Sequence, residues 1–115
     1  LSGTLASLAA ANSAINHVTL RPSDDAWVVV FDNSNWQGQG IPTTCANYLN
    51  SLRANGTVIN AVALTSGDGW VVVSGNNTIY AVNIPTAMYN AFGTIAGANG
   101  TIKSAVIGPN GAWLI

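Results

Sequence analysis

Two stretches of the chain place carboxamide groups beside an aromatic ring. Proteins bind sugars with such groups, because sugar hydroxyls need hydrogen-bond donors and acceptors while the C–H face of a sugar needs an apolar plane. We therefore predict a carbohydrate-binding site on these stretches. The opposing interpretation is that Asn and Asp only shape turns and that the rings pack on neighbours. The predicted ligand-binding residues are Asp32, Asn33, Asn35 and Trp36 in the first stretch and Asn76, Asn77 and Tyr80 in the second.

Carboxylates for catalysis are scarce. The chain contains Asp24, Asp25, Asp32 and Asp68 and no Glu. Three of them, Asp24, Asp25 and Asp68, fall in predicted hairpin turns, where Asp is favoured because it bonds the local backbone. A pair of carboxylates for glycoside hydrolysis is therefore poorly supported.

The only other candidate pair for catalysis is His17 with Cys45, as a base and a nucleophile. Cys45 occupies a helical position that Met88 occupies later in the chain, which favours an apolar core role. His17 begins a strand where the later copy has Ala61, which favours a structural or incidental histidine. The sequence contains no cluster with metal-ligand spacing and no phosphate-binding loop. We therefore predict a non-enzyme that needs neither a metal nor a cofactor.

The composition limits the partners of the chain. Hydrophobic residues make up 49% of the 115 residues and charged residues only 6%. The cations are Arg21, Arg53 and Lys103, too few and too scattered to neutralise phosphates, so we predict no nucleic-acid binding. No apolar run approaches about 20 residues, so membrane insertion is not expected. The low charge leans towards a secreted or otherwise extracytosolic protein.

Three tryptophans indicate internal repetition. Trp27, Trp70 and Trp113 are spaced 43 residues apart, and each begins a short apolar run. Similarity at a fixed period is typical of repeat architectures. We predict a single domain over residues 1–115. Its parts are a leading helix at about 1–15, a first repeat at 16–56, a second at 57–100 and a truncated third at 101–115.

Each full repeat is expected to contain three strands and a helix. The β-branched runs at 18–20, 58–64 and 102–107 each precede a turn and a tryptophan-led strand, which indicates hairpins. Short third strands are expected at 36–40 and 79–83. Apolar spacing and flanking Pro and Gly predict helices at about 4–11, 42–54 and 85–98. The predicted fold class is α+β, with β-β-β-α repeats of about 43 residues forming one largely antiparallel sheet flanked by helices.

The tryptophan-led strands are apolar on both faces and must be covered on both faces. Either the helices divide between the two faces, as in an α-β-α sandwich, or a second subunit covers one face. The final run, Trp113-Leu114-Ile115, lacks a third strand and would present an apolar edge. We predict that a homodimer with a shared sheet covers this edge. The alternative is that the chain's own first strand covers it in a closed, propeller-like ring.

The charge-poor composition, the helix-and-meander repeats around Trp27 and Trp70, and the Asn-rich turns beside Trp36 and Tyr80 resemble the small αβ lectins of mushroom fruiting bodies. The resemblance covers the architecture and composition of the whole chain without a diagnostic motif. It implies glycan binding without catalysis, a dimer built by joining sheets and no metal requirement. The expected partners are therefore glycans or glycoproteins. The alternative function is a structural or protein-interaction repeat module that self-assembles through sheet edges.

Overall fold

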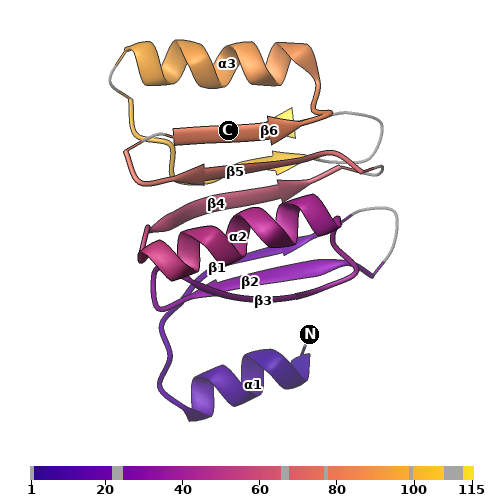
Figure 1. Cartoon of the computed structure of the whole chain (residues 1–115), viewed down its shortest axis with the longest axis vertical. Coiled ribbons are helices and arrows are strands. Elements are labelled where there is room, and N and C mark those ends of the chain that lie inside the picture. Colours follow the sequence, from indigo (N-terminus) through magenta and orange to yellow (C-terminus); the bar gives the residue numbers. More distant parts are fainter. Residues whose placement is uncertain (1, 22–24, 66–67, 77, 99, 108–112) are drawn as a thin grey trace.

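The computed structural model describes residues 2–21, 25–65, 68–76, 78–98, 100–107 and 113–115. Within this part of the chain three helices and eight strands follow the order of the expected repeats (Figure 1). The elements are α1 (Ser2–Ala10), β1 (Ile15–Leu20), β2 (Trp27–Phe31), β3 (Asn35–Gln39), α2 (Thr43–Asn55), β4 (Ile59–Leu64), β5 (Trp70–Ser74), β6 (Thr78–Val82), α3 (Thr86–Gly97), β7 (Val106–Ile107) and β8 (Trp113–Leu114). The α+β class is therefore confirmed.

The helix boundaries agree with the predictions to within two residues because local sequence sets them. Helix α2 begins after Pro42 and α3 begins after Pro85, where the missing N–H of proline costs no helical hydrogen bond. Helix α2 ends at Gly56, which adopts the left-handed conformation with φ 66°. Its N–H donates to the carbonyl of Arg53, and the N–H of Thr57 donates to that of Leu52.

The strands form three antiparallel sheets, β1-β2-β3, β4-β5-β6 and β7-β8, rather than the single sheet that we predicted. Strands β1 and β4 lie side by side, yet a side chain joins them instead of a backbone ladder. The hydroxyl of Thr19 donates a 2.6 Å hydrogen bond to the carbonyl of Val62. The sheets therefore stack against one another instead of merging edge to edge. The third sheet is also shorter than expected, because its first strand covers only Val106–Ile107.

The first two sheets share one register. Leu20 pairs with Trp27 in the first sheet as Leu64 pairs with Trp70 in the second. Each first strand also has a register shift near its start, at Asn16 and at Asn60. In the third sheet Ile107 pairs with Trp113. Each tryptophan is thus paired with an apolar residue of the preceding strand.

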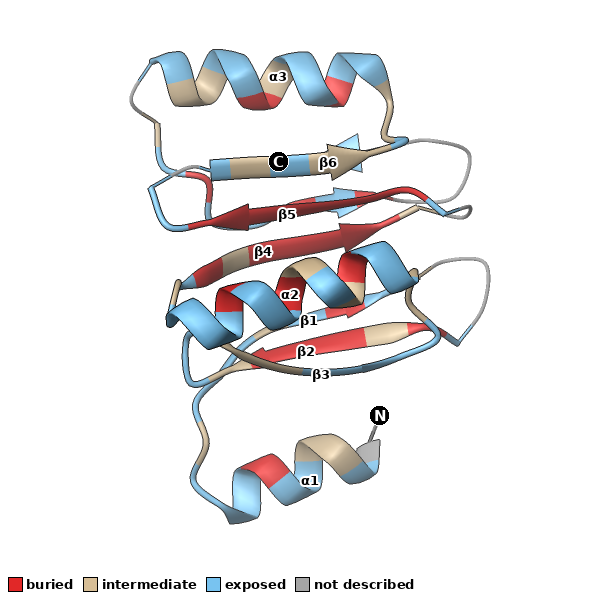
Figure 2. Ribbon diagram, in the orientation of Figure 1, coloured by how far each residue is buried: buried red, intermediate tan, exposed pale blue. Residues whose placement is uncertain are grey.

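Strands β4 and β5 of the middle sheet are buried on both faces, as Figure 2 shows. One face packs against α2 and the first sheet, through residues such as Val62, Trp70 and Val72. The other face packs against α3 and β7, through residues such as Ala63 and Val71. Of the two arrangements considered for the helices, the division between opposite faces is therefore the one found at this sheet. The described strand orders pair β1 with β2 and β8 with β7, so they do not form the closed ring.

Candidate binding groove beside helix α2

The first predicted stretch forms a hairpin turn whose polar groups hold the backbone. Asp32 lies in this turn with φ 49° and is exposed. Its carboxylate accepts a 3.0 Å hydrogen bond from the N–H of Ala14, while its own N–H donates to the carbonyl of Ala14. The structure therefore gives Asp32 a turn-forming role, which is the opposing interpretation of the sequence pattern.

The asparagines of the two turns also make contacts along the chain. The N–H of Asn33 donates to the side chain of Asn16, and its carbonyl accepts from the N–H of Ile59. Asn35 starts β3 and is half-buried. Asn76 lies exposed in the turn after β5, and Asn77 lies outside the described residues.

Trp36 is half-buried and faces helix α2. Its indole N–H donates a 3.2 Å hydrogen bond to the side-chain oxygen of Asn50, which also accepts a 2.8 Å bond from Arg53. The guanidinium carbon of Arg53 lies 5.8 Å from the centroid of the Trp36 ring, within range of a cation–π contact. One flank of α2 thus carries an indole, an amide and a cation in mutual contact.

Tyr80 lies against the opposite flank of the same helix, at the N-terminal side of its middle. Its ring stacks on Tyr48 of α2 with centroids 4.6 Å apart, and on Trp70 with centroids 5.3 Å apart and planes 6° apart. Trp70 is 1% exposed, whereas Tyr80 is 50% exposed. The indole N–H of Trp70 donates a 3.0 Å bond to the hydroxyl of Thr44. Tyr80 therefore offers an aromatic face that a buried ring supports.

The two predicted stretches do not form equivalent sites. Trp36 pairs with Val30, which lies on the face of β2 opposite to that of Trp27. Tyr80 pairs with Val72, which lies on the same face of β5 as Trp70. Relative to the leading tryptophan the two rings are offset by one residue, and a one-residue offset reverses the face of a strand residue. Trp36 contacts Asn50 of α2 and Tyr80 contacts Tyr48 of α2. Helix α2 lies between the sheets that carry the two residues (Figure 1).

An open groove of about 480 Å³ lies at the N-terminal end of α2. Val82 lines it, and Tyr80 lies two residues earlier on the same face of β6. Thr44 also lines it and carries the hydrogen bond from Trp70. We call it the α2 groove. Its lining residues are Arg21, Gly40, Ile41, Pro42, Thr43, Thr44, Asp68, Val82 and Asn83.

The polar groups around the α2 groove combine donors and acceptors. Arg21 contributes a guanidinium that donates to the carbonyl of Gly40 at 3.0 Å. Asp68 contributes an exposed carboxylate, Thr43 a hydroxyl, and Asn83 a carboxamide. The volume is within the range of small-ligand sites, about 300–1,000 Å³. The arrangement can therefore accept a polar molecule with several hydroxyls.

Sequence reasoning missed most of this groove. Its residues come from four separate connections, the first turn of α2 and strand β6, so no local pattern gathers them. One signal for the neighbouring surface of α2 was available, because Asn47, Tyr48 and Asn50 have low helix propensity yet lie inside this continuous helix. Such residues on a short helix indicate a surface that tertiary contacts use.

The candidate catalytic pair does not assemble. Cys45 is fully buried in the core, and this burial raises the pKa of its thiol from 9.0 to about 12. His17 lies on β1, where its Nε2 is 3.1 Å from the carbonyl of Val62. Because a carbonyl only accepts, this contact requires the Nε2 tautomer that carries the proton. The described hydrogen bonds include none between His17 and Cys45.

Comparisons with protein-family models, with curated proteins and with solved structures find no match. Among the residues that the structure describes, no helix is long and apolar enough to cross a membrane. The same described residues contain no group of three or more His, Cys, Asp or Glu side chains placed to hold a metal ion.

Proposed function

We propose that this protein is a non-catalytic carbohydrate-binding protein that takes a glycan in the α2 groove. The observation that carries the proposal is half-exposed Tyr80, whose ring stacks on Tyr48 and Trp70 and which lies two residues from Val82 in the lining of a polar groove. A sugar ring can place its C–H face on such a ring while its hydroxyls reach the groove. This shifts the site from the Asn-rich turns to the helix between them and keeps only Tyr80 at its centre.

The polar lining supports a neutral polyol better than an ion. Asp68 accepts hydrogen bonds, Arg21 donates them, and Thr43 and Asn83 do both. A sugar hydroxyl is both donor and acceptor, so it can use each of these groups. Among the groove residues described, Asp68 alone carries a carboxylate, whereas most glycoside hydrolases use two. This supports binding without hydrolysis.

We also propose that the chain is a tandem array of β-β-β-α units with boundaries near 16–56, 57–100 and 101–115. The shared register of the first two sheets and the register shifts at Asn16 and Asn60 support this organisation. In such an array a groove forms where the helix of one unit meets the sheet of the next. The α2 groove is the one such junction with a described sheet of three strands on each side.

The test is retention on immobilised glycans, preceded by a glycan array with the full chain to choose the sugar. Tyr80→Ala and Asp68→Asn should each reduce retention at least tenfold while far-ultraviolet circular dichroism and the melting temperature show a folded protein. Tyr89→Ala is the matched control, because Tyr89 is 56% exposed on α3, away from the groove. It should bind as the unmodified chain does.

Two results would contradict the proposal. One is a blank array for a folded sample at every concentration that the chain tolerates. The other is retention that Tyr80→Ala leaves unchanged but Trp36→Ala abolishes, which would place binding on the flank of α2 formed with Asn50 and Arg53. The second candidate function, an assembly or protein-interaction module, is favoured by the exposed apolar side chains of the last hairpin, Val106 and Leu114. It uses a different surface and is compatible with glycan binding.

A further inference from the structure

Each sheet has one face that can meet the sheet before it in the chain and one face that can meet the sheet after it. Val28 and Val30 of the first sheet share a core with Val62 and Trp70 of the second, so these faces meet. Ala63 and Val71, on the other face of the second sheet, share a core with Ile107 of the third. We call the face towards the later sheet the forward face and the face towards the earlier sheet the backward face.

The pairing register assigns the same two faces to the outer sheets. In the first sheet Val18 and Leu20 occupy the positions that Val62 and Leu64 occupy in the second, so they lie on the backward face. Val106 pairs with Leu114 as Ala63 pairs with Val71, so this pair lies on the forward face of the third sheet. Cross-strand partners share a face of their sheet.

Apolar side chains are exposed on both of these outer faces, while Val29 on the backward face of the first sheet is buried. On the backward face of the first sheet Val18 is 41% exposed and Leu20 is 60% exposed. On the forward face of the third sheet Val106 is 55% exposed and Leu114 is 70% exposed. The equivalent residues of the middle sheet, Leu64 at 1% and Val71 at 0%, are buried because a neighbouring sheet and a helix together cover them.

We propose that a second copy of this chain docks head to tail, with the forward face of its third sheet on the backward face of the first sheet. The two exposed faces are the two halves of a contact that the chain already makes twice internally. A forward face meets a backward face between the first and second sheets and again between the second and third.

Helix α1 lies where the docked copy would need a helix, on the outer side of the first sheet. In the internal contact α2 precedes the second sheet and packs in the core between it and the first sheet. Helix α1 precedes the first sheet in the same way and lies beyond it in Figure 1, at the opposite end from α3. Its exposed residues include Ala6, Ala9 and Ala10, which are small enough for a second sheet to approach closely. The head-to-tail contact therefore repeats the helix–sheet order of the chain.

The geometry also favours identical copies over a charged partner. The net charge is −1, so two copies repel each other weakly, and a net charge near zero promotes association.

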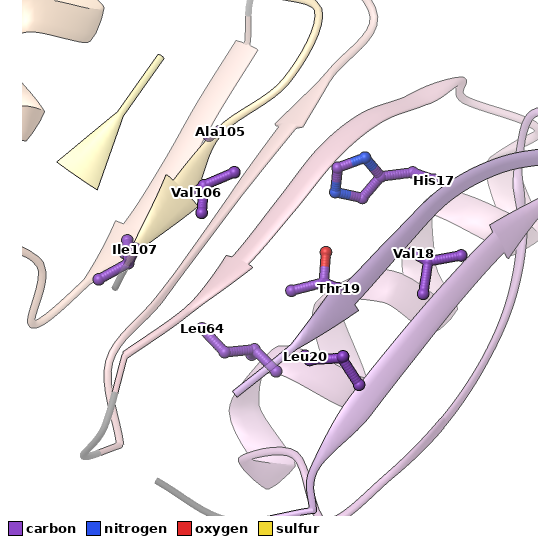
Figure 3. A pocket seen from close by; sticks show the side chains of 8 residues that line it. All are labelled: His17, Val18, Thr19, Leu20, Leu64, Ala105, Val106 and Ile107. Carbon is purple, nitrogen blue, oxygen red and sulfur yellow. The ribbon is translucent and has the colours of Figure 1, made fainter. Parts of the chain in front are cut away.

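The first strands of the three sheets converge on a small pocket of about 80 Å³, lined by Thr19, Leu64 and Val106 among others (Figure 3). The three sheets are therefore arranged around their first strands. A head-to-tail contact is heterologous, so it gives a ring if the rotation closes and a filament if it does not.

The test uses one blocked face at a time. Leu20→Asp blocks the backward face and Leu114→Asp blocks the forward face, and both side chains are exposed, so folding should persist. Sedimentation of the unmodified chain should show masses above the 11.8 kDa monomer that increase with concentration or reach a fixed ring. Each variant alone should remain a monomer. An equimolar mixture should form a dimer of about twice the monomer mass, because each variant keeps the face that the other lacks.

The controls separate this contact from the alternatives. Ser51→Asp adds the same charge on the exposed side of α2 and should assemble as the unmodified chain does. Circular dichroism and the melting temperature verify that each variant is folded. Three results overturn the proposal: an unmodified chain that is monomeric at every concentration, blocked variants that fail to pair when mixed, or a dimer that survives both substitutions. The last result would instead indicate pairing through the edge at Trp113.

Discussion

The ring of Trp70 lies nearly parallel to the ring of Tyr80, with the planes 6° apart and the centroids 5.3 Å apart. One ring is buried and the other is half exposed, so the core sets the orientation of a surface ring. The hydrogen bond from the Trp70 indole to Thr44 also fixes the position of this buried ring relative to the first turn of α2, which lines the groove. The stability of the core and the shape of the proposed site are therefore coupled.

Thr44→Val should destabilise the protein by about 1–3 kcal/mol, because it leaves the buried indole N–H of Trp70 without its acceptor. Denaturant unfolding measures this change. Thr43→Val, on the same turn of the helix, is the control and should change the free energy of unfolding by less than about 0.5 kcal/mol. Equal effects of the two substitutions would show that the bond to Trp70 is not what Thr44 contributes.

Asp32→Ala should destabilise the chain by about 1–2 kcal/mol while leaving glycan retention unchanged in the folded fraction. The substitution removes the bond to the Ala14 N–H and places alanine at φ 49°. Asp32→Gly should cost less, because glycine adopts positive φ freely and the corresponding turn residue, Gly75, has φ 53°. Loss of retention by a folded Asp32→Ala protein would restore the turn as a binding site.

Two glycines should respond to alanine with opposite signs. Gly93 lies inside α3, and an added Cβ would meet no atom within 4 Å, so Gly93→Ala should stabilise the protein by about 0.5–1 kcal/mol. Gly56 also has open space, but its φ is 66°, so Gly56→Ala should destabilise it by about 1 kcal/mol. Thermal melts of the two variants decide the matter. Equal shifts would mean that backbone conformation does not control these sites.

Stability should fall as the pH rises from about 9 towards 12, in part because of Cys45. Burial raises the pKa of its thiol from 9.0 to about 12. In that window the unfolded state loses the thiol proton while the folded state keeps it, so the unfolded state binds fewer protons and stability decreases with pH. Cys45→Ala should have a flatter profile than the unmodified chain. Comparing the two by denaturant unfolding cancels the contributions of other groups, and parallel profiles would contradict the assignment.

The candidate site was only partly accessible from sequence. Tyr80 could be found because an aromatic ring beside Asn-rich residues is a local pattern. Tyr48, Thr44 and Asp68 could not, because they come from a helix and a turn whose proximity depends on how α2 packs between two sheets. The offset between Trp36 and Tyr80 was also invisible, since strand register depends on pairing across the hairpin.

Local sequence determined the helices, the hairpins and the α+β class, because Pro42, Pro85 and Gly56 act through backbone geometry within a few residues. It also determined that Cys45 belongs to the core, since its spacing places it on an apolar helix face. Only the tertiary structure decided that the strands form three stacked sheets instead of one. The sheets stack because side-chain contacts such as that of Thr19 with Val62 join them, where a continuous backbone ladder would have merged them into one sheet. These contacts join residues far apart in the chain, so no local preference encodes them.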